Sequence, residues 1–344
     1  MRSANSRIVN VTAIDEDGQP ATDLTATDFQ LFDDNRLQAI VMVNRLSALG
    51  SQRATILVLF DLLNTIPGQR ENSATLIARA LQPLESGDFI FLYLLTNYGE
   101  LYPVHPLSVP PQKADSSNAL TRAEHPNASW TQQVRPLLDQ AIEKVNARRL
   151  KDFQDQGTRT AATFLALDDI GNAFTKIQGP KTIVWITRGA ANWVDYPYGC
   201  KDAFFTEGSA NYLAGRCGND CTRAPGVSKC MDYTPFLQRF GMKLVRSDTM
   251  LYSVVVNPQF SELPVDRGTP MNTLQQLSDL SGGRLYVRGE IEKAIAQSLL
   301  DIRSRYQLIY EAPDPNGRYH KLKVDCSRKD VRLEAPKGYF AEKP

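Results

Sequence analysis

Residues 54–60 read ATILVLF, and residues 61–65 continue as DLLNT. The first segment is an uninterrupted apolar run, which indicates a strand covered on both faces, as in a parallel sheet. Asp61, Asn64 and Thr65 follow it at once. In an open α/β sheet, ligands bind in the loops at the carboxyl ends of the strands, so these polar residues mark a candidate site.

Three more apolar runs of strand length occur along the chain, at DFIFLYLL (88–95), KTIVWIT (181–187) and TMLYSVVVN (249–257). Segments with helical periodicity separate them, at residues 71–84, 131–150, 160–177 and 234–247, and the proline-rich stretch 103–111 is predicted to be a loop. Thr269 and Pro270 predict the N-cap and first turn of a further helix. Buried strands alternating with helices predict a doubly wound, mostly parallel sheet with helices on both faces.

Both ends of the chain carry β patterns instead. Residues 7–45 contain alternating apolar and polar positions, and residues 28–43 are predicted to form two strands around the turn at 33–35. After Tyr306 the β pattern returns. We therefore expect an N-terminal β arm (1–50), an α/β core (51–305) and a C-terminal β arm (306–344), with the two arms packed into one small β domain. Residues 190–232 have no sustained period and are predicted to be an insertion in the core.

Composition limits the classes of partner. Of 344 residues, 42% are hydrophobic and 22% charged, as in ordinary globular proteins. The 39 basic and 38 acidic residues give a net charge of +1, so no nucleic-acid partner is expected. No apolar stretch approaches the roughly 20 residues of a membrane span.

Four of the five cysteines fall in the insertion, at Cys200, Cys217, Cys221 and Cys230. This local, even-numbered cluster predicts two disulfides and an oxidising compartment, with three pairings open. A structural zinc site, which the C-x3-C spacing permits, or four reduced thiols are the alternatives. The N-terminus has no apolar signal core. We therefore expect an exported protein (periplasmic, cell-surface or secreted) whose signal peptide is not part of this sequence.

No catalytic motif stands out, so an enzyme is not expected. The three histidines are scattered, and neither a G-x-S-x-G elbow nor a phosphate-binding loop occurs. Asp168 and Asp169 lie in a helical pattern and are predicted to be surface charges.

The insertion is also rich in aromatic residues. They are Trp193, Tyr196, Tyr198, Phe204, Phe205 and Tyr212. Such residues serve in recognition surfaces, and they also form small cores under long loops. Either role fits the sequence, and some rings could face inwards while others bind a partner.

The chain resembles the von Willebrand factor type A domain, and in particular the exported VWFA-related proteins of Acidobacteria. In the core the resemblance rests on ILVLFDLLNT, TFLALDDIGNAF, GPKTIVWITRG, LYSVVV and LQQLSDLSGGRLY. Outside the core it includes VTAIDEDGQPATDLTATDFQLFDDN, SRYQLIYEAPDPNGRYHKLKV and VRLEAPKGYFA. The order of these segments over nearly the whole chain carries the resemblance, which implies a type A, Rossmann-like core.

The resemblance also implies a metal-ion-dependent adhesion site, in which a partner's carboxylate completes the coordination of Mg²⁺, Mn²⁺ or Ca²⁺. Asp61 matches its first aspartate and Thr65 its second serine, whereas Leu63 replaces the first serine. The threonine of the second loop is either Thr160 or Thr163. At the later aspartate the chain has Arg188.

Arg188 leaves two alternatives, because a guanidinium cannot ligate a metal. It points away and leaves a weak cation site of Asp61, Thr65 and Asn64, or it pairs with Asp61 and replaces the cation. The sequence favours a protein without a bound cofactor.

These inferences predict a non-enzymatic protein–protein recognition or adhesion module of the bacterial cell envelope with a degenerate adhesion site. The alternatives are a structural assembly module without cation chemistry and, third, a hydrolase-like enzyme that uses the cysteine-rich loop.

Overall fold

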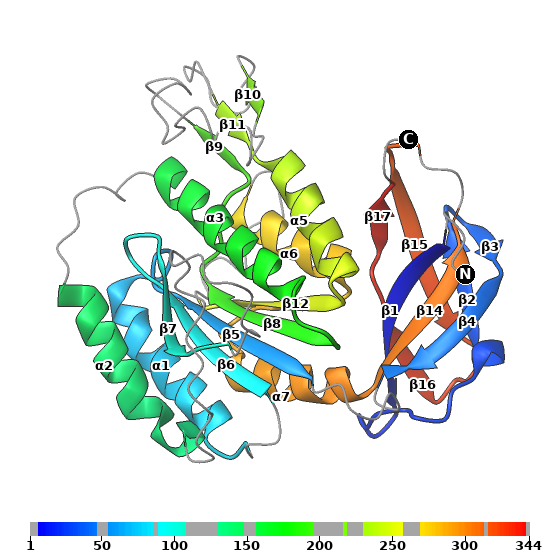
Figure 1. Ribbon diagram of the computed structural model, residues 1–344, viewed down its shortest axis with the longest axis horizontal. Coiled ribbons are helices and arrows are strands. Elements are labelled where there is room, and N and C mark those ends of the chain that lie inside the picture. Colours follow the sequence, from blue (N-terminus) through cyan, green and yellow to red (C-terminus); the bar gives the residue numbers. More distant parts are fainter. Residues whose placement is uncertain are drawn as a thin grey trace.

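A computed structural model describes residues 6–46, 54–84, 89–107, 130–147, 156–195, 216–218, 230–256, 269–312 and 316–341. These residues form an α/β unit and a smaller β unit that lie side by side (Figure 1). The fold is therefore mixed α/β, as the sequence predicts.

The α/β unit is built on a six-stranded sheet with the order β13-β12-β8-β5-β6-β7. Its strands are β5 (Thr55–Asp61), β6 (Phe89–Leu95), β7 (Leu101–His105), β8 (Lys181–Thr187), β12 (Thr249–Val255) and β13 (Leu285–Tyr286). All neighbours run parallel except β7, which pairs antiparallel with β6. The loop predicted at 103–111 is therefore partly strand. Pro103 is tolerated there because β7 is an edge strand.

Helices cover both faces of this sheet (Figure 1). The helices α3 (Gln156–Phe174), α5 (Thr234–Arg246) and α6 (Pro270–Ser281) share one apolar core with it. The helices α1 (Pro67–Leu81), α2 (Val134–Ala147) and α7 (Ile291–Arg303) share the other, and the 3-10 turn η3 (Trp130–Gln133) precedes α2. The Thr269 side chain accepts a hydrogen bond from the Asn272 amide, which confirms the predicted N-cap of α6.

Asp168, on α3, is not the surface charge that the sequence predicts. Its side chain is 13% exposed, and it accepts hydrogen bonds from Lys243 Nζ at 2.5 Å and from Asn172 Nδ2 at 3.1 Å. Asp169 is exposed, as expected. The ion pair with Lys243 joins α3 to α5, and periodicity alone cannot show which of two adjacent acids turns towards a neighbouring helix.

The β unit is built from both ends of the chain, as predicted. One sheet has the order β16-β1-β14-β4 and the other β17-β15-β2-β3. Their strands are β1 (Ser6–Asp15), β2 (Phe29–Asp33), β3 (Arg36–Gln38), β4 (Ile40–Arg45), β14 (Arg305–Glu311), β15 (Tyr319–Cys326), β16 (Val331–Glu334) and β17 (Gly338–Phe340), with the 3-10 turn η1 (Ala26–Asp28) before β2. Residues 28–43 contain three strands rather than two, because the chain passes from one sheet to the other after β3.

A small antiparallel sheet lies in the predicted insertion, with the order β10-β11-β9. Its strands are β9 (Trp193–Asp195), β10 (Arg216–Gly218) and β11 (Cys230–Asp232). It leaves the α/β unit directly after β8, and therefore stands at the carboxyl edge of the main sheet (Figure 1).

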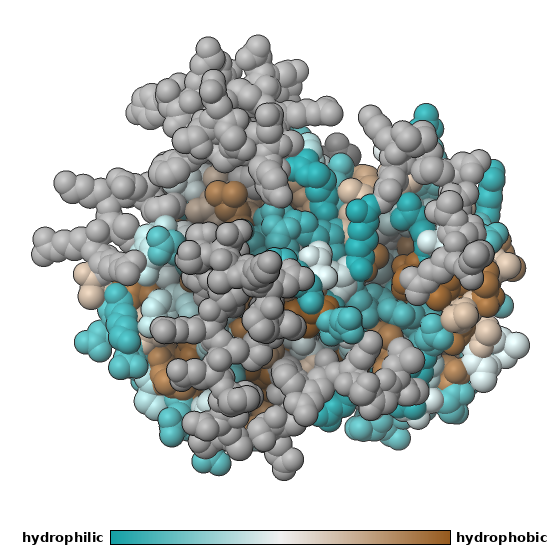
Figure 2. All heavy atoms as spheres, viewed as in Figure 1, coloured by the Kyte–Doolittle hydropathy of each residue, from teal (hydrophilic) through white to brown (hydrophobic). Residues whose placement is uncertain are grey.

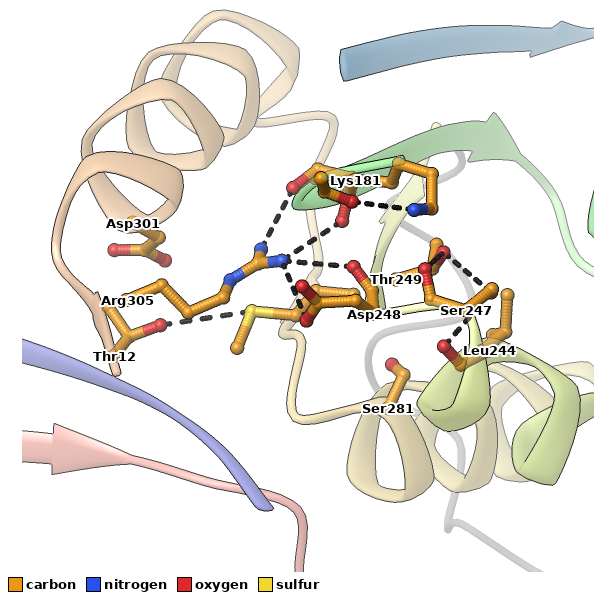
Figure 3. Close-up of polar contacts among 12 residues, drawn as sticks. Thr12, Lys181, Leu244, Ser247, Asp248, Thr249, Ser281, Asp301 and Arg305 are labelled. Carbon is orange, nitrogen blue, oxygen red and sulfur yellow. Dashed lines mark hydrogen bonds and ion pairs between the residues drawn. The ribbon is translucent and has the colours of Figure 1, made fainter. Parts of the chain in front are cut away.

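The opposite, amino edge of the sheet is closed by Arg305, the first residue of β14 (Figure 3). This side chain is fully buried. Its Nη1 donates to the carbonyl oxygens of Lys181 and Asp248, and its Nη2 to Thr182 Oγ1, each at 3.2 Å. Because these acceptors lie at the starts of β8 and β12, Arg305 joins the β unit to the amino edge of the six-stranded sheet.

Candidate functional site

Asp61 ends β5 at the carboxyl edge, and its carboxyl group is fully buried. Oδ1 accepts a hydrogen bond from the Asn64 backbone amide at 3.0 Å. Oδ2 accepts two more, from Asn64 Nδ2 at 2.8 Å and from the Thr187 hydroxyl at 2.6 Å. Both carboxylate oxygens of Asp61 thus accept hydrogen bonds from the protein. The donor that comes from the end of β8 is the Thr187 hydroxyl.

Burial raises the pKa of Asp61, whereas the hydrogen bonds from Thr187 and Asn64 lower it. The positive charge nearby belongs to Arg70, and burial lowers the pKa of Arg70 while the charge of Asp61 raises it. The Arg70 guanidinium donates to the carbonyl oxygens of Leu62, at 2.7 Å, and Thr65, at 3.1 Å. The Arg70 side chain therefore holds the loop after β5 through two of its backbone carbonyl groups.

Of the two candidate threonines on α3, Thr163 is joined to Asp61. Asn64 Nδ2 donates to Thr163 Oγ1 at 2.8 Å, and that hydroxyl donates to the Arg159 carbonyl oxygen at 2.8 Å. Thr160 is 2% exposed and lines the open depression described below. Asn64 is thus the bridge between β5 and α3.

Leu63 and Thr65 complete the loop after β5. Leu63 is 8% exposed and belongs to the apolar core under α3, α5 and α6. Thr65 is 2% exposed, and its hydroxyl oxygen has no hydrogen-bond partner among the described residues. The Thr65 hydroxyl is therefore the one predicted ligand of this loop that the protein leaves unused.

Arg188 follows β8 at once and lines an open depression of ≈140 Å³. Partial burial and the charge of Arg159 lower the pKa of Arg188. The next residue, Gly189, has a φ of +88°, and a Cβ there would lie 2.9 Å from Pro270 Cβ. Glycine therefore lets the chain turn sharply against α6 at the floor of the depression. The described residues around it are Asn64, Gln156, Arg159, Thr160, Arg188, Gly189, Ala190, Ala191 and Pro270.

This donor set does not fit a Mg²⁺ site. Mg²⁺ requires near-octahedral oxygen coordination, and Asp61, the carboxylate that the described residues offer here, already accepts three hydrogen bonds. Leu63 offers no ligand, and two guanidinium groups occupy the same edge. A divalent cation would have to displace the Asn64 and Thr187 bonds and meet two positive charges.

Few residues of the predicted partner surface lie in the described part of the chain. Trp193 begins β9 and is 39% exposed. Tyr196, Tyr198, Phe204, Phe205, Tyr212, Cys200 and Cys221 lie outside the described residues. Cys217 and Cys230 are described only as backbone in β10 and β11. The disulfide pairing stays a prediction.

Sequence reasoning missed three residues of this site. Thr187 and Arg70 hold Asp61 and its loop, and Arg159 forms half of a pair of arginines. The sequence carries a signal for Arg159, because this residue directly precedes Thr160, a candidate ligand on the same helix. Thr187 ends a buried strand beside Arg188, where a hydroxyl faces the same edge as Asp61.

A second polar cluster lies in the β unit. Asp33 Oδ2 accepts hydrogen bonds from the hydroxyls of Tyr310 at 2.8 Å and Tyr339 at 2.7 Å. Asp33 Oδ1 lies 3.1 Å from His320 Nδ1, which is 3.2 Å from Asp34 Oδ2. These bonds join four strands from the two ends of the chain, which accounts for the cluster as a structural one.

Comparison with known proteins gives no family. No family model matches the sequence, and no curated protein matches it. An aerotolerance-related membrane protein from Bacteroides fragilis shares 11% identity over 73% of this chain and 98% of its own, with a TM-score of 0.35. The open form of the pilus adhesin SpaC from Lactobacillus rhamnosus GG shares 9% identity over 94% of this chain, with a TM-score of 0.34. A second SpaC structure shares 12% over 83%, with a TM-score of 0.33.

This chain spans 42% and 35% of the two SpaC chains. At these TM-scores the likenesses add nothing to the fold that the strand order itself establishes. Among the described residues, no helix combines the length and the apolar character that a membrane crossing needs.

Proposed function

We propose that this chain is a non-enzymatic protein-recognition module of the bacterial cell envelope, and that it binds its partner at the carboxyl edge of the α/β sheet. One observation carries the proposal. The depression at that edge is open, while the amino edge is occupied by the buried Arg305 and the β unit. Ligands of open α/β sheets bind at the carboxyl ends of the strands.

The chemistry of the edge favours binding over catalysis. The described side chains that line the depression are two amides, one hydroxyl, two guanidinium groups, two alanine methyls and a proline ring. At neutral pH such groups donate and accept hydrogen bonds but do not exchange protons readily. Asp61, the carboxylate beneath them, is held by Asn64 and Thr187.

Trp193 supplies an apolar anchor beside the polar depression. Its side chain is 39% exposed on β9, and Ala190 and Ala191 of the same segment line the depression. Tryptophan and arginine are the residues most enriched in the energetic centres of protein interfaces. The resemblance to exported type A proteins, together with the cysteine cluster, supports an extracytoplasmic location.

Site-specific photo-crosslinking tests the proposal. A photoreactive amino acid replaces Trp193 in the full chain, and Leu37 in a matched control. Leu37 is 66% exposed on β3, in the β unit, where apolar atoms are also visible on the surface (Figure 2). Nonspecific adhesion to apolar surface would therefore label position 37 at least as strongly as position 193.

We expect one discrete crosslinked protein from position 193 in an envelope extract, and its loss when unlabelled wild-type chain is added in excess. Equal labelling from position 37, or labelling that the competitor does not reduce, would contradict the proposal. Repeating the reaction in EDTA measures whether the contact needs a cation.

A further inference from the structure

Three side chains that are able to bind a metal ion converge in the β unit, at the turn between β2 and β3. Asp33 ends β2, Asp34 begins the turn, and His320 lies on β15, the strand that pairs with β2. Asp33 Oδ1 is 3.1 Å and Asp34 Oδ2 3.2 Å from His320 Nδ1. One nitrogen and two carboxylate oxygens, from opposite ends of the chain, thus lie within 4.8 Å of one another.

The hydrogen bonds on the far side of the imidazole determine which ring nitrogen faces the carboxylates as an acceptor. The Arg318 backbone amide donates to Asn316 Oδ1 at 2.9 Å. This atom is therefore the carbonyl oxygen, because a side-chain NH₂ group there would face another donor. His320 Nε2 lies 3.0 Å from the same oxygen and must carry a proton. In the neutral ring, Nδ1 then directs its lone pair at two anionic oxygens, so a cation has to stand between the three atoms.

The distances favour a metal ion over a proton as that cation. A charged N–H donates to a carboxylate over about 2.7–2.9 Å. The two separations from His320 Nδ1 are 3.1 and 3.2 Å, and one proton would have to serve both oxygens. Zn²⁺ binds nitrogen and oxygen at about 2.0–2.2 Å, and two such ligands of a tetrahedral ion stand roughly 3.2–3.4 Å apart. The observed separations lie at the short end of that range.

Both carboxylates are also held in place from behind, as metal ligands are in proteins. Asp33 Oδ2 accepts hydrogen bonds from the Tyr310 and Tyr339 hydroxyls, which leaves Oδ1 turned towards His320. The Asp34 amide donates to the Lys321 carbonyl oxygen, and Asp34 Oδ1 accepts from the Lys321 amide. These bonds fix Asp34 Oδ2 as the oxygen that faces the imidazole.

Burial differs among the three candidate ligands in a way that suits a bound ion. The Asp33 side chain is fully buried and that of His320 is 5% exposed, whereas that of Asp34 is 53% exposed. Two ligands are therefore shielded from water, where their attraction for a cation is strong. Asp34 connects them to the solvent and gives the ion a route of entry.

We propose that Asp33, Asp34 and His320 bind Zn²⁺ through Oδ1, Oδ2 and Nδ1, with a water molecule or another oxygen ligand in the fourth position. An imidazole ligand favours zinc over Mg²⁺ and Ca²⁺, which prefer oxygen alone. The ion would join β2 to β15 and so fasten the N-terminal arm to the C-terminal arm. This zinc site goes beyond the proposed function, and neither depends on the other.

Titration of the full chain with zinc tests the site after EDTA dialysis and removal of the chelator. The imidazole ¹⁵N resonances report Nδ1 and Nε2 of His320 separately, and circular dichroism gives the melting temperature. We expect zinc to shift Nδ1 saturably, to leave Nε2 protonated and to raise the melting temperature. Mg²⁺ and Ca²⁺ at the same concentrations should do neither. Because the cysteines of the insertion could also take up zinc, the response is measured at His320 itself.

Substitutions assign the response to the three side chains. H320Q and D34N should each weaken zinc binding by roughly 100-fold or more, since each removes a ligand, and D34N changes a half-exposed residue with little risk to folding. N316A should weaken it about 10- to 100-fold, because Asn316 orients the imidazole without touching the ion. D17N, at an exposed residue of the turn after β1, removes the same charge as D34N and should bind zinc like the wild type.

Three outcomes would overturn the proposal. In the first, both ring nitrogens of His320 are protonated and do not respond to millimolar zinc, which would identify an imidazolium ion pair. In the second, zinc raises the melting temperature of D34N and H320Q as much as that of the wild type, which would place the ion elsewhere. In the third, Mg²⁺ or Ca²⁺ shifts the His320 resonances as strongly as zinc does.

Discussion

Replacing Arg305 by methionine tests whether the two units are joined as the structure indicates. The guanidinium is fully buried and makes three hydrogen bonds at 3.2 Å, to the carbonyl oxygens of Lys181 and Asp248 and to Thr182 Oγ1. Its Nη1 also lies 3.9 Å from Asp248 Oδ1, an oxygen with no hydrogen-bond partner among the described residues. Methionine keeps most of the volume and removes every one of these contacts.

The expected cost follows from what the substitution leaves behind. Each hydrogen bond to a charged group contributes about 1.5–3 kcal/mol, and part of that sum is offset because the buried guanidinium no longer has to be desolvated. Removing one member of a buried charged pair costs about 3–5 kcal/mol in other proteins. We expect R305M to lower the free energy of unfolding by about 4 kcal/mol. With a urea m-value of about 3 kcal/mol/M, the midpoint falls by roughly 1.3 M.

Tryptophan fluorescence during urea titration measures this effect in the α/β unit, because Trp130, Trp185 and Trp193 all lie in it. R305K should fall between the wild type and R305M, since lysine keeps the charge but cannot span three acceptors. R303M is the matched control at an exposed position two residues away. If R305M loses no more stability than R303M, within about 0.5 kcal/mol, the junction does not depend on this side chain.

Three further predictions concern other contacts. T187V keeps the shape of the side chain but removes the hydroxyl that donates to Asp61 at 2.6 Å. It should lower the free energy of unfolding, measured by urea titration, by about 1.5–3 kcal/mol, and an unchanged free energy would contradict the site geometry. Burial lowers the pKa of His105 from 6.5 to about 4, so stability is complete above pH 6.5 and falls as pH drops towards 4. Because solvent screens the partly exposed ring, the free energy of unfolding falls by only about 1 kcal/mol over this range. H105F should abolish this pH dependence in melting curves recorded between pH 4 and 7. G283A would place a Cβ 2.0 Å from the carbonyl oxygen of Leu251, so we expect little folded protein by circular dichroism, and a wild-type melting curve would refute that close approach.

Much of the fold follows from local sequence patterns. The continuous apolar runs become the four central strands because a parallel sheet covered on both faces buries every side chain of each strand. Thr269 and Pro270 mark the start of α6 because capping depends on neighbouring residues alone. The strand β7 is missed because Pro103 indicates a loop, and only its position at the sheet edge permits a strand there.

The site is less visible from the sequence because its contacts are not local. Spacing identifies Asp61 and Asn64, which lie three residues apart and are hydrogen-bonded to each other in the structure. Spacing does not reveal that Thr187 reaches Asp61 across 126 positions, or that Arg159 on α3 lines the same depression as Arg188. Side-chain direction at a strand end depends on the next turn, here at Gly189, and such turns are set by tertiary packing.

The pairing of the two chain ends determines how the protein responds to mechanical load. Residue 6 in β1 and residue 311 in β14 stand opposite each other, and β2 pairs with β15 in the second sheet. The α/β unit is inserted in the chain between β4 and β14, which pair with each other. Tension applied between residues 6 and 341 is therefore carried by the hydrogen-bonded ladders of the β unit. The carboxyl edge of the α/β sheet stays unstretched until those ladders separate, so pulling on residues 6 and 341 leaves the geometry around Asp61 unchanged.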